Sequence, residues 1–265
     1  MFITGYDKFS VPSPLGNDST LIMNVSLIID DIITIDENDG FFKTKITMER
    51  RWLNTQLTYQ NLKRNVADNR ISKEDREKMW TPWTVFENIE HEGDLRYTDL
   101  QQDILRIIPH PEFRFEKSDR TNVRNTRLFK GSENVISYRR QYTVKWMCSY
   151  NMRWYPFDTQ RCTIEMFSPE SLVTLNPVFV NYSGPVDLPQ HFVKGVHICA
   201  AIINDKSGFI VEVFLGRPIF GTFLSVFMPT IILLLLSQIM RVFGKEYFEL
   251  VIEVNLTILL VLATL

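Results

Sequence analysis

The sequence predicts an all-β sandwich followed by transmembrane α-helices, and the main reason is the distribution of charge. Charged side chains are spread through residues 1–217 and nearly vanish beyond Arg217. Before that point, short runs of β-branched and aromatic residues alternate with turn formers, which is typical of a sandwich. Beyond it, two long apolar runs follow. We therefore expect a sandwich domain over 1–217 and a membrane domain over 218–265.

The strand signal is clearest in six runs of the first domain. Turn residues at 38–40 and 204–208 each separate two of these runs, as in β-hairpins. Residues 61–79 are polar and predict a short helix or loop, and 109–132 predict an exposed excursion. The six expected strands are 24–36, 41–53, 134–148, 163–167, 195–203 and 208–215.

The first apolar run contains no Asp, Glu, Lys, Arg or His between Arg217 and Arg241. At about 1.5 Å per residue its 23 residues span roughly 34 Å, enough to cross a bilayer core of about 30 Å. A first membrane helix over about 218–241 is expected, and a buried core helix is the alternative. Arg241 and Lys245 flank its far end, which indicates the cytoplasmic side.

The second apolar run, 246–265, carries carboxylates at positions that share one helix face. Glu246, Glu249 and Glu253 are three and four residues apart, and the same stripe continues through Leu256 and Leu260. Carboxylates in a membrane helix normally face water or a partner. The run therefore predicts a second membrane helix with one acidic face. The alternative is an amphipathic helix that lies on the membrane surface.

Several observations favour an exported protein and exclude other classes. The net charge of -2 gives no basis for nucleic-acid binding. No metalloprotease, hydrolase or phosphate-loop motif occurs, and the histidines lack metal-ligand spacing, so neither an enzyme nor a cofactor or metal site is expected. We expect Cys199 to be a buried small hydrophobe. Within residues 1–217, three glycosylation sequons begin at Asn17, Asn24 and Asn181.

The segment from Cys148 to Cys162 resembles the signature loop of the Cys-loop receptors, the pentameric ligand-gated ion channels. Two cysteines enclose thirteen residues around an aromatic-Pro-Phe-Asp core, made here of Tyr155, Pro156, Phe157 and Asp158. The resemblance implies a Cys148–Cys162 disulfide, which for a loop of this size contributes about 3 kcal/mol in the chain-entropy model. It also implies a cis bond before the proline, which is a modest cost for an X–Pro bond.

Other positions are similar to the same family along essentially the whole chain. Trp52 matches a tryptophan of the second strand, Trp80-Thr81-Pro82 a Trp-x-Pro motif, and Pro229 the proline of the first membrane helix. The family has four membrane helices in each subunit, whereas these residues end after the second. We therefore expect the sequence to be incomplete.

The resemblance implies that five subunits surround a pore lined by the second helix. Glu246, Glu249 and Glu253 would form acidic rings that select cations, and Leu256 and Leu260 apolar rings that close the pore. A slip of the helix register by one residue would instead turn Glu249 and Glu253 off the axis.

The resemblance also implies a junction that couples the sandwich to the helices. Glu37, Asp158 and Arg217 are similar to the family's electrostatic cluster there, together with the loop residues Tyr155, Pro156 and Phe157. The alternative is three independent surface charges.

The agonist pocket departs from the family pattern. At the positions of the aromatic box that binds amines by cation–π attraction, the sequence carries Glu87, Pro169 and Thr47. Glu87, Glu170 and Arg153 are therefore candidate pocket residues for an unidentified ligand, with solvated surface charges as the alternative.

We thus expect a cation-selective channel subunit of the plasma membrane, multi-pass, with its N-terminal domain outside the cell. Its expected partners are identical or related subunits, membrane lipid, a small extracellular ligand and permeant cations. The alternative is a non-conducting, membrane-anchored subunit that binds ligand or assembles with other channel subunits.

Overall fold

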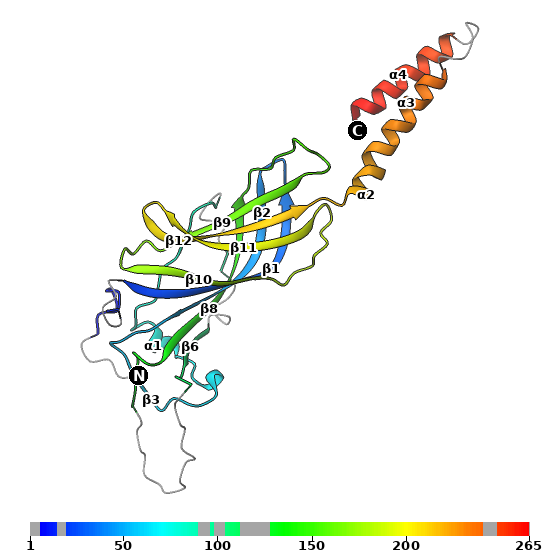
Figure 1. The fold of residues 1–265 in the computed structure, drawn as a ribbon. Coiled ribbons are helices and arrows are strands. Elements are labelled where there is room, and N and C mark those ends of the chain that lie inside the picture. Colours follow the sequence, from blue (N-terminus) through cyan, green and yellow to red (C-terminus); the bar gives the residue numbers. More distant parts are fainter. Residues whose placement is uncertain are drawn as a thin grey trace. The chain divides into compact units, whose positions relative to one another are not determined.

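The computed structural model describes residues 6–14, 20–89, 96–97, 104–111, 128–240 and 248–264. Figure 1 shows strands through the first part of the chain and helices at its C-terminal end. The chain divides into two compact units. The larger comprises residues 1–150, 161–185 and 195–214, and the smaller comprises 151–160, 186–194 and 215–265.

Most of the larger unit is built on a six-stranded sheet with the order β10-β1-β2-β8-β5, to which β6 adds by pairing with β8. All of its pairs are antiparallel except β1 with β10. The strands are β1 (Leu21–Asp36), β2 (Phe41–Trp52), β5 (Arg96–Tyr97), β6 (Ile104–Ile108), β8 (Val135–Met147) and β10 (Val173–Tyr182).

A second sheet of four strands has the order β11-β12-β9-β4. Its strands are β4 (Val85–Phe86), β9 (Thr159–Phe167), β11 (Phe192–Ile203) and β12 (Lys206–Gly216). A small ribbon pairs β3 (Thr58–Gln60) with β7 (Leu128–Lys130). The six strands expected from the sequence all fall in these elements, although 41–53 and 134–148 extend one residue beyond β2 and β8.

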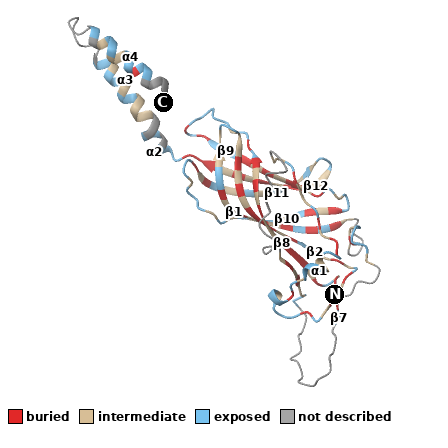
Figure 2. Ribbon diagram, turned by 180° about the vertical axis from the view of Figure 1, so that it is seen from behind, coloured by how far each residue is buried: buried red, intermediate tan, exposed pale blue. Residues whose placement is uncertain are grey.

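The core forms because the inward side chains alternate along each strand, the period-2 pattern of a half-buried strand. In β1, buried residues at 21, 23, 25, 27 and 29 alternate with more exposed ones, and Figure 2 shows the same alternation on the neighbouring strands. The ring of Phe86 on the smaller sheet lies 5.2 Å from Tyr142 and 5.6 Å from Trp146 on the larger one. The two sheets therefore pack face to face, which confirms the predicted sandwich.

The polar segment after β3 forms two short helical turns, as the sequence predicted. These are η1 (Val66–Asp68) and α1 (Lys73–Arg76). Ser72 caps α1, since its hydroxyl accepts from the backbone N–H of Asp75 at 3.1 Å. Most of the expected excursion at 109–132 lies outside the described residues.

The C-terminal helical segments belong to the smaller unit. They are α2 (Ile219–Thr222), the π-helix η4 (Phe223–Phe227), α3 (Met228–Met240) and α4 (Phe248–Thr264). The single helix expected over 218–241 is thus divided into three. Pro229 explains the division, because it has no N–H to donate one turn back and so disturbs the α-helical pattern in the residues before it.

Taken one by one, the helices of the described residues all fall short of the length and apolarity that a bilayer crossing requires.

Candidate functional site

The disulfide loop is held at both ends by buried cysteines. Cys148 follows β8, Cys162 lies in β9, and the two are joined by a disulfide with Cα atoms 5.1 Å apart. The Tyr155–Pro156 peptide bond is cis. Both features agree with the expectation from the sequence. Of the thirteen residues between the cysteines, 151–160 belong to the smaller unit together with residues 215–265.

Within that unit, Asp158 and Arg217 form a buried ion pair. The Arg217 Nε donates to both carboxylate oxygens of Asp158, at 2.9 and 3.0 Å. The Arg217 side chain is 6% exposed and the Asp158 side chain is 3% exposed. A buried charge is strongly destabilising without its partner, so the pair fixes the loop to Arg217, the residue two positions before α2.

Three further loop residues complete the surroundings of this ion pair. The Gln160 amide donates to Asp158 as well as to the backbone oxygen of Asn151, at 3.0 Å for the latter. The Arg217 guanidinium lies 4.8 Å from the centre of the Tyr155 ring and donates to the Met152 sulfur at 3.2 Å. The polar groups are therefore satisfied in a network rather than by one contact.

Neither Gln160 nor Met152 was expected from the sequence. The signal for Gln160 was its position two residues after Asp158, which places both on the same face of an extended segment. Pro156, Asp158 and Gln160 are buried, and this pattern of alternation leaves the intervening residues exposed. Of these, Phe157 is 72% exposed, and Trp154 nearby is 70% exposed.

A glycine beside Arg217 permits a second close contact. A Cβ on Gly216 would lie 2.5 Å from the Lys194 side chain and 2.6 Å from the Phe192 ring. The Lys194 ammonium in turn donates to the Thr159 hydroxyl at 2.6 Å. Residues on both sides of the ion pair are thus packed against β11.

Glu37, the third member of the expected cluster, lies in the turn between β1 and β2 of the larger unit. Burial, with the charges of Glu37 and Asp36 adding to it, raises the pKa of Tyr150. The Tyr150 hydroxyl donates to the backbone oxygen of Phe41 at 3.0 Å.

The candidate pocket residues are divided between the two units, with Glu87 and Glu170 in the larger unit and Arg153 in the smaller one. Glu87 is exposed and accepts from Asn204, in the hairpin between β11 and β12, at 2.9 Å. Burial raises the pKa of Glu170 above its ordinary value. Arg153 is exposed on the disulfide loop, with its guanidinium 5.8 Å from the Trp154 ring centre. Within the larger unit, no ion pair or hydrogen bond joins Glu87 to Glu170.

The acidic stripe lies on the exposed side of α4. Glu249, Glu253, Leu256 and Leu260 are all exposed, with the two leucines at 71% and 68%. The opposite side contacts α3, since Asn255 accepts from the Ser237 hydroxyl at 2.6 Å. At about 100° per residue, buried Ile258 points about 180° from Glu249. Ile252 and Leu259 are also exposed, so the exposed side of α4 is wider than the stripe alone. Glu246, the first carboxylate of the predicted stripe, lies outside the described residues.

Two of the three sequons lie on exposed strand positions. Asn24 in β1 accepts from Asn176 in β10 at 2.8 Å, and Asn181 lies near the end of β10. Asn17 lies outside the described residues. The expectation for Cys199 was wrong, because this free cysteine is exposed on β11, the edge strand of the smaller sheet.

The described residues thus form a β-sandwich with a disulfide-closed loop, and an acid–arginine pair holds this loop to Arg217, two residues before α2. Residues 1–172 match the family model described as the neurotransmitter-gated ion-channel ligand binding domain. Since this match covers most of the chain, the protein belongs to that family, the Cys-loop pentameric channels. Members of the family are ligand-gated ion channels and not enzymes.

Individual relatives are similar at low identity. A gamma-aminobutyric acid receptor subunit beta from Caenorhabditis elegans is 24% identical over 94% of this chain and 42% of the relative. A glutamate-gated chloride channel from Drosophila melanogaster is 23% identical over 73% of this chain and 36% of the relative. A proton-gated ion channel from Gloeobacter violaceus is 20% identical over 60% of this chain and 35% of the relative. The chain spans less than half the length of each.

Proposed function

We propose that the chain is a subunit of a pentameric, cation-selective channel that an extracellular ligand opens. The observation that carries the proposal is the stripe of α4, where Glu249 and Glu253 precede Leu256 and Leu260 on a face turned away from α3. In a ring of five subunits, this stripe supplies carboxylates that attract cations and leucines that close the pore by dewetting.

The membrane part of this proposal rests on the sequence between Arg217 and Arg241. No charged side chain occurs there, and the helical segments α2, η4 and α3 follow one another without interruption over residues 219–240. The Thr230 hydroxyl donates to the backbone oxygen of Phe227 at 2.8 Å, next to Pro229. We place the sandwich outside the cell, with glycans at Asn24, Asn181 and Asn17.

Selectivity for cations is the part that most needs a test, because two of the relatives are named as chloride channels. Acidic rings favour cations by their charge. The experiment is a current recording from the full-length protein in oocytes, with a ligand panel that includes pH steps. Reversal potentials are measured as sodium and chloride are replaced in turn.

We expect the reversal potential to follow sodium, and to lose that dependence in Glu249→Gln and Glu253→Gln. The matched control is Glu74→Gln, which neutralises an exposed carboxylate in the first turn of α1. A reversal potential that follows chloride in the unmodified protein would refute cation selectivity while leaving the channel function intact.

Gating is proposed to pass through the Asp158–Arg217 pair, because it links the disulfide loop to the start of α2. Neutralising Arg217 should therefore uncouple ligand binding from opening. Normal gating in Arg217→Gln would remove this role from the pair.

A second candidate function is a non-conducting subunit that assembles with other channel subunits. The observation in its favour is that Glu87, at an expected agonist position, is already engaged by Asn204. Surface expression without current, followed by current on co-expression with related subunits, would support this alternative.

A further inference from the structure

The sulfur atom of Met152 lies beside the Asp158–Arg217 ion pair and shares its donors. The Arg217 Nη2 donates to the sulfur at 3.2 Å, and the Gln160 amide nitrogen lies 4.0 Å from it. Both side chains also donate to Asp158. A thioether sulfur is only a weak hydrogen-bond acceptor. Two donors that hold a buried carboxylate therefore converge on an atom that accepts poorly.

Two other arginines, both in the larger unit, donate to oxygen atoms instead. Arg50, which is 3% exposed and stacks on the Tyr138 ring at 4.6 Å, donates to three neutral groups. These are the backbone oxygen of Pro82 and the hydroxyls of Thr84 and Tyr142. Arg76 donates to the Tyr138 hydroxyl at 2.8 Å. Compared with these oxygens, the Met152 sulfur gives the Arg217 Nη2 a weaker hydrogen bond.

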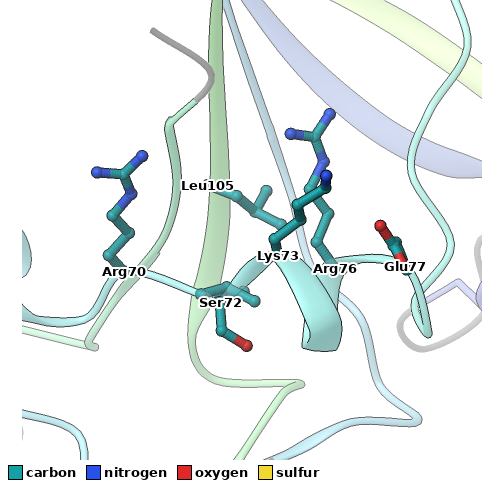
Figure 3. Close-up of a pocket in the computed structure, with 7 residues that line it drawn as sticks. Arg70, Ser72, Lys73, Arg76, Glu77 and Leu105 are labelled. Carbon is teal, nitrogen blue, oxygen red and sulfur yellow. The ribbon is translucent and has the colours of Figure 1, made fainter. Parts of the chain in front are cut away.

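Arg76 also lines a cavity of about 550 Å³ beside α1, where basic side chains gather (Figure 3). The described lining residues are Arg70, Ile71, Ser72, Lys73, Arg76, Glu77 and Leu105. None of them is a methionine. The other basic cluster in view thus offers an oxidant no sulfur atom, whereas the cluster around Arg217 does.

Met152 is accessible to an oxidant dissolved in water, because it is 39% exposed. Within the described part of the sandwich, Met147 is the other exposed methionine, at 57%. The remaining methionines of that part are buried, namely Met23, Met48, Met79 and Met166. An oxidant has to reach the sulfur atom to react with it. Met147 and Met152 are therefore the first methionines of the sandwich that it can attack.

The surroundings of Met152 suit a sulfoxide better than a thioether. Oxidation makes a methionine side chain polar, which disrupts an apolar core. Here, however, the groups next to the sulfur are two donors, the Arg217 guanidinium and the Gln160 amide. Methionine has three rotatable bonds, so a partly exposed sulfur can withdraw towards water and leave its position to the new oxygen. That oxygen would accept from Arg217 in a charge-assisted hydrogen bond.

We propose that Met152 is an oxidation site for peroxide and that Arg217 and Gln160 hold the resulting sulfoxide. The sulfur lone pair attacks one oxygen of hydrogen peroxide, the O–O bond breaks, and the leaving hydroxide takes the proton of the transferred oxygen to form water. Sulfur is oxidised by two electrons and the peroxide is reduced. The new hydrogen bond ties the disulfide loop more firmly to Arg217. This effect on stability does not depend on the proposed channel activity.

The test is thermal unfolding of the full-length protein in detergent, before and after treatment with hydrogen peroxide. The midpoint should rise by about 2–4 °C, because a weak hydrogen bond becomes a charge-assisted one. Peptide mapping by mass spectrometry locates the added oxygen. Cleavage after Lys145 and Arg153 gives one peptide that contains both Met147 and Met152, so fragment ions must distinguish the two.

Variants separate Met152 from the other reactive side chains. Met152→Leu keeps the volume of the side chain and should lose the response to peroxide. Met152→Gln supplies an amide oxygen in place of the sulfoxide oxygen, so its midpoint should be raised without peroxide and should not respond to it. The controls are Met147→Leu and Cys199→Ser, which remove the other exposed methionine and the exposed free cysteine. Both should keep the full response.

Three results would overturn the proposal. The first is an unmodified Met152 at a peroxide concentration that oxidises Met147. The second is a sulfoxide at Met152 together with an unchanged or lowered midpoint, which would mean that Arg217 does not hold the new oxygen. The third is a peroxide response that persists in Met152→Leu, which would assign the effect to another residue.

Discussion

Removing the guanidinium of Arg217 should destabilise the protein far more than removing a surface arginine. In Arg217→Gln the Asp158 carboxylate, 3% exposed, loses the donor that approaches both of its oxygens. Breaking a buried ion pair from one side costs about 3–5 kcal/mol, because the remaining charge stays buried. For a chain of this size, about 1 kcal/mol corresponds to a shift of about 2–4 °C in the midpoint of thermal unfolding. The expected decrease is therefore roughly 6–20 °C.

The assay is thermal unfolding of the full-length protein, followed as the loss of its monodisperse peak after heating. Arg161→Gln is the matched control, because Arg161 also pairs with a carboxylate, that of Glu212, but is 60% exposed. Exposed pairs contribute about 0–1 kcal/mol, so this midpoint should barely change.

A double variant separates the buried charge from the lost contact. Replacing both partners by apolar residues, as in Asp158→Leu with Arg217→Met, leaves no uncompensated charge and should recover most of the midpoint. If Arg217→Gln costs no more than Arg161→Gln, or if the double variant is worse than both single ones, the reasoning is wrong.

Three further predictions concern other contacts. Cys148→Ser or Cys162→Ser should lose about 3 kcal/mol of stability, and reductant should lower the thermal midpoint of the unmodified protein but not of these variants. Asn255→Val and Ser237→Ala should each cost about 1 kcal/mol in detergent, and the double variant should cost no more, because both remove the same hydrogen bond; additive losses would contradict this. Burial raises the pKa of Glu170 above its ordinary 4.5, so the folded state holds this proton more tightly and the stability of the protein falls as pH rises from about 4.5 through the raised pKa. Glu170→Gln should remove that decrease, which midpoints measured between acidic and neutral pH will show.

The strand pattern was predictable because it is local. Alternating burial along β1 follows directly from side chains that point to opposite faces of an extended chain. The same rule could have identified Arg50, since it shares the inward face of β2 with Trp52, Met48 and Ile46. The residue type argued against a buried Arg50, because arginine is almost never buried without a partner. Its aromatic and backbone partners come from elsewhere in the chain, so nothing near it in the sequence indicates them.

The exposure of Cys199 and the cavity beside α1 were not predictable, for a related reason. Cysteine is usually buried, but Cys199 lies on β11 at the edge of its sheet, and edge position depends on the pairing of distant strands. Residues 70–77 read as a polar loop. They become one wall of a cavity only because Leu105 in β6 and Tyr138 in β8 lie against them.

The sequence by itself determined the sandwich, the charge gap after Arg217, the disulfide loop through its motif, and the acidic stripe of α4. Each is a matter of spacing along one stretch of chain, which the periodicity of strands and helices converts into a face. Only the tertiary structure decided which charges are buried together. It buried the expected pair of Asp158 and Arg217, turned the stripe away from α3, and left three cations around one cavity. Such partners are distant in sequence, and electrostatic energy depends on their separation in space and on their exposure to water.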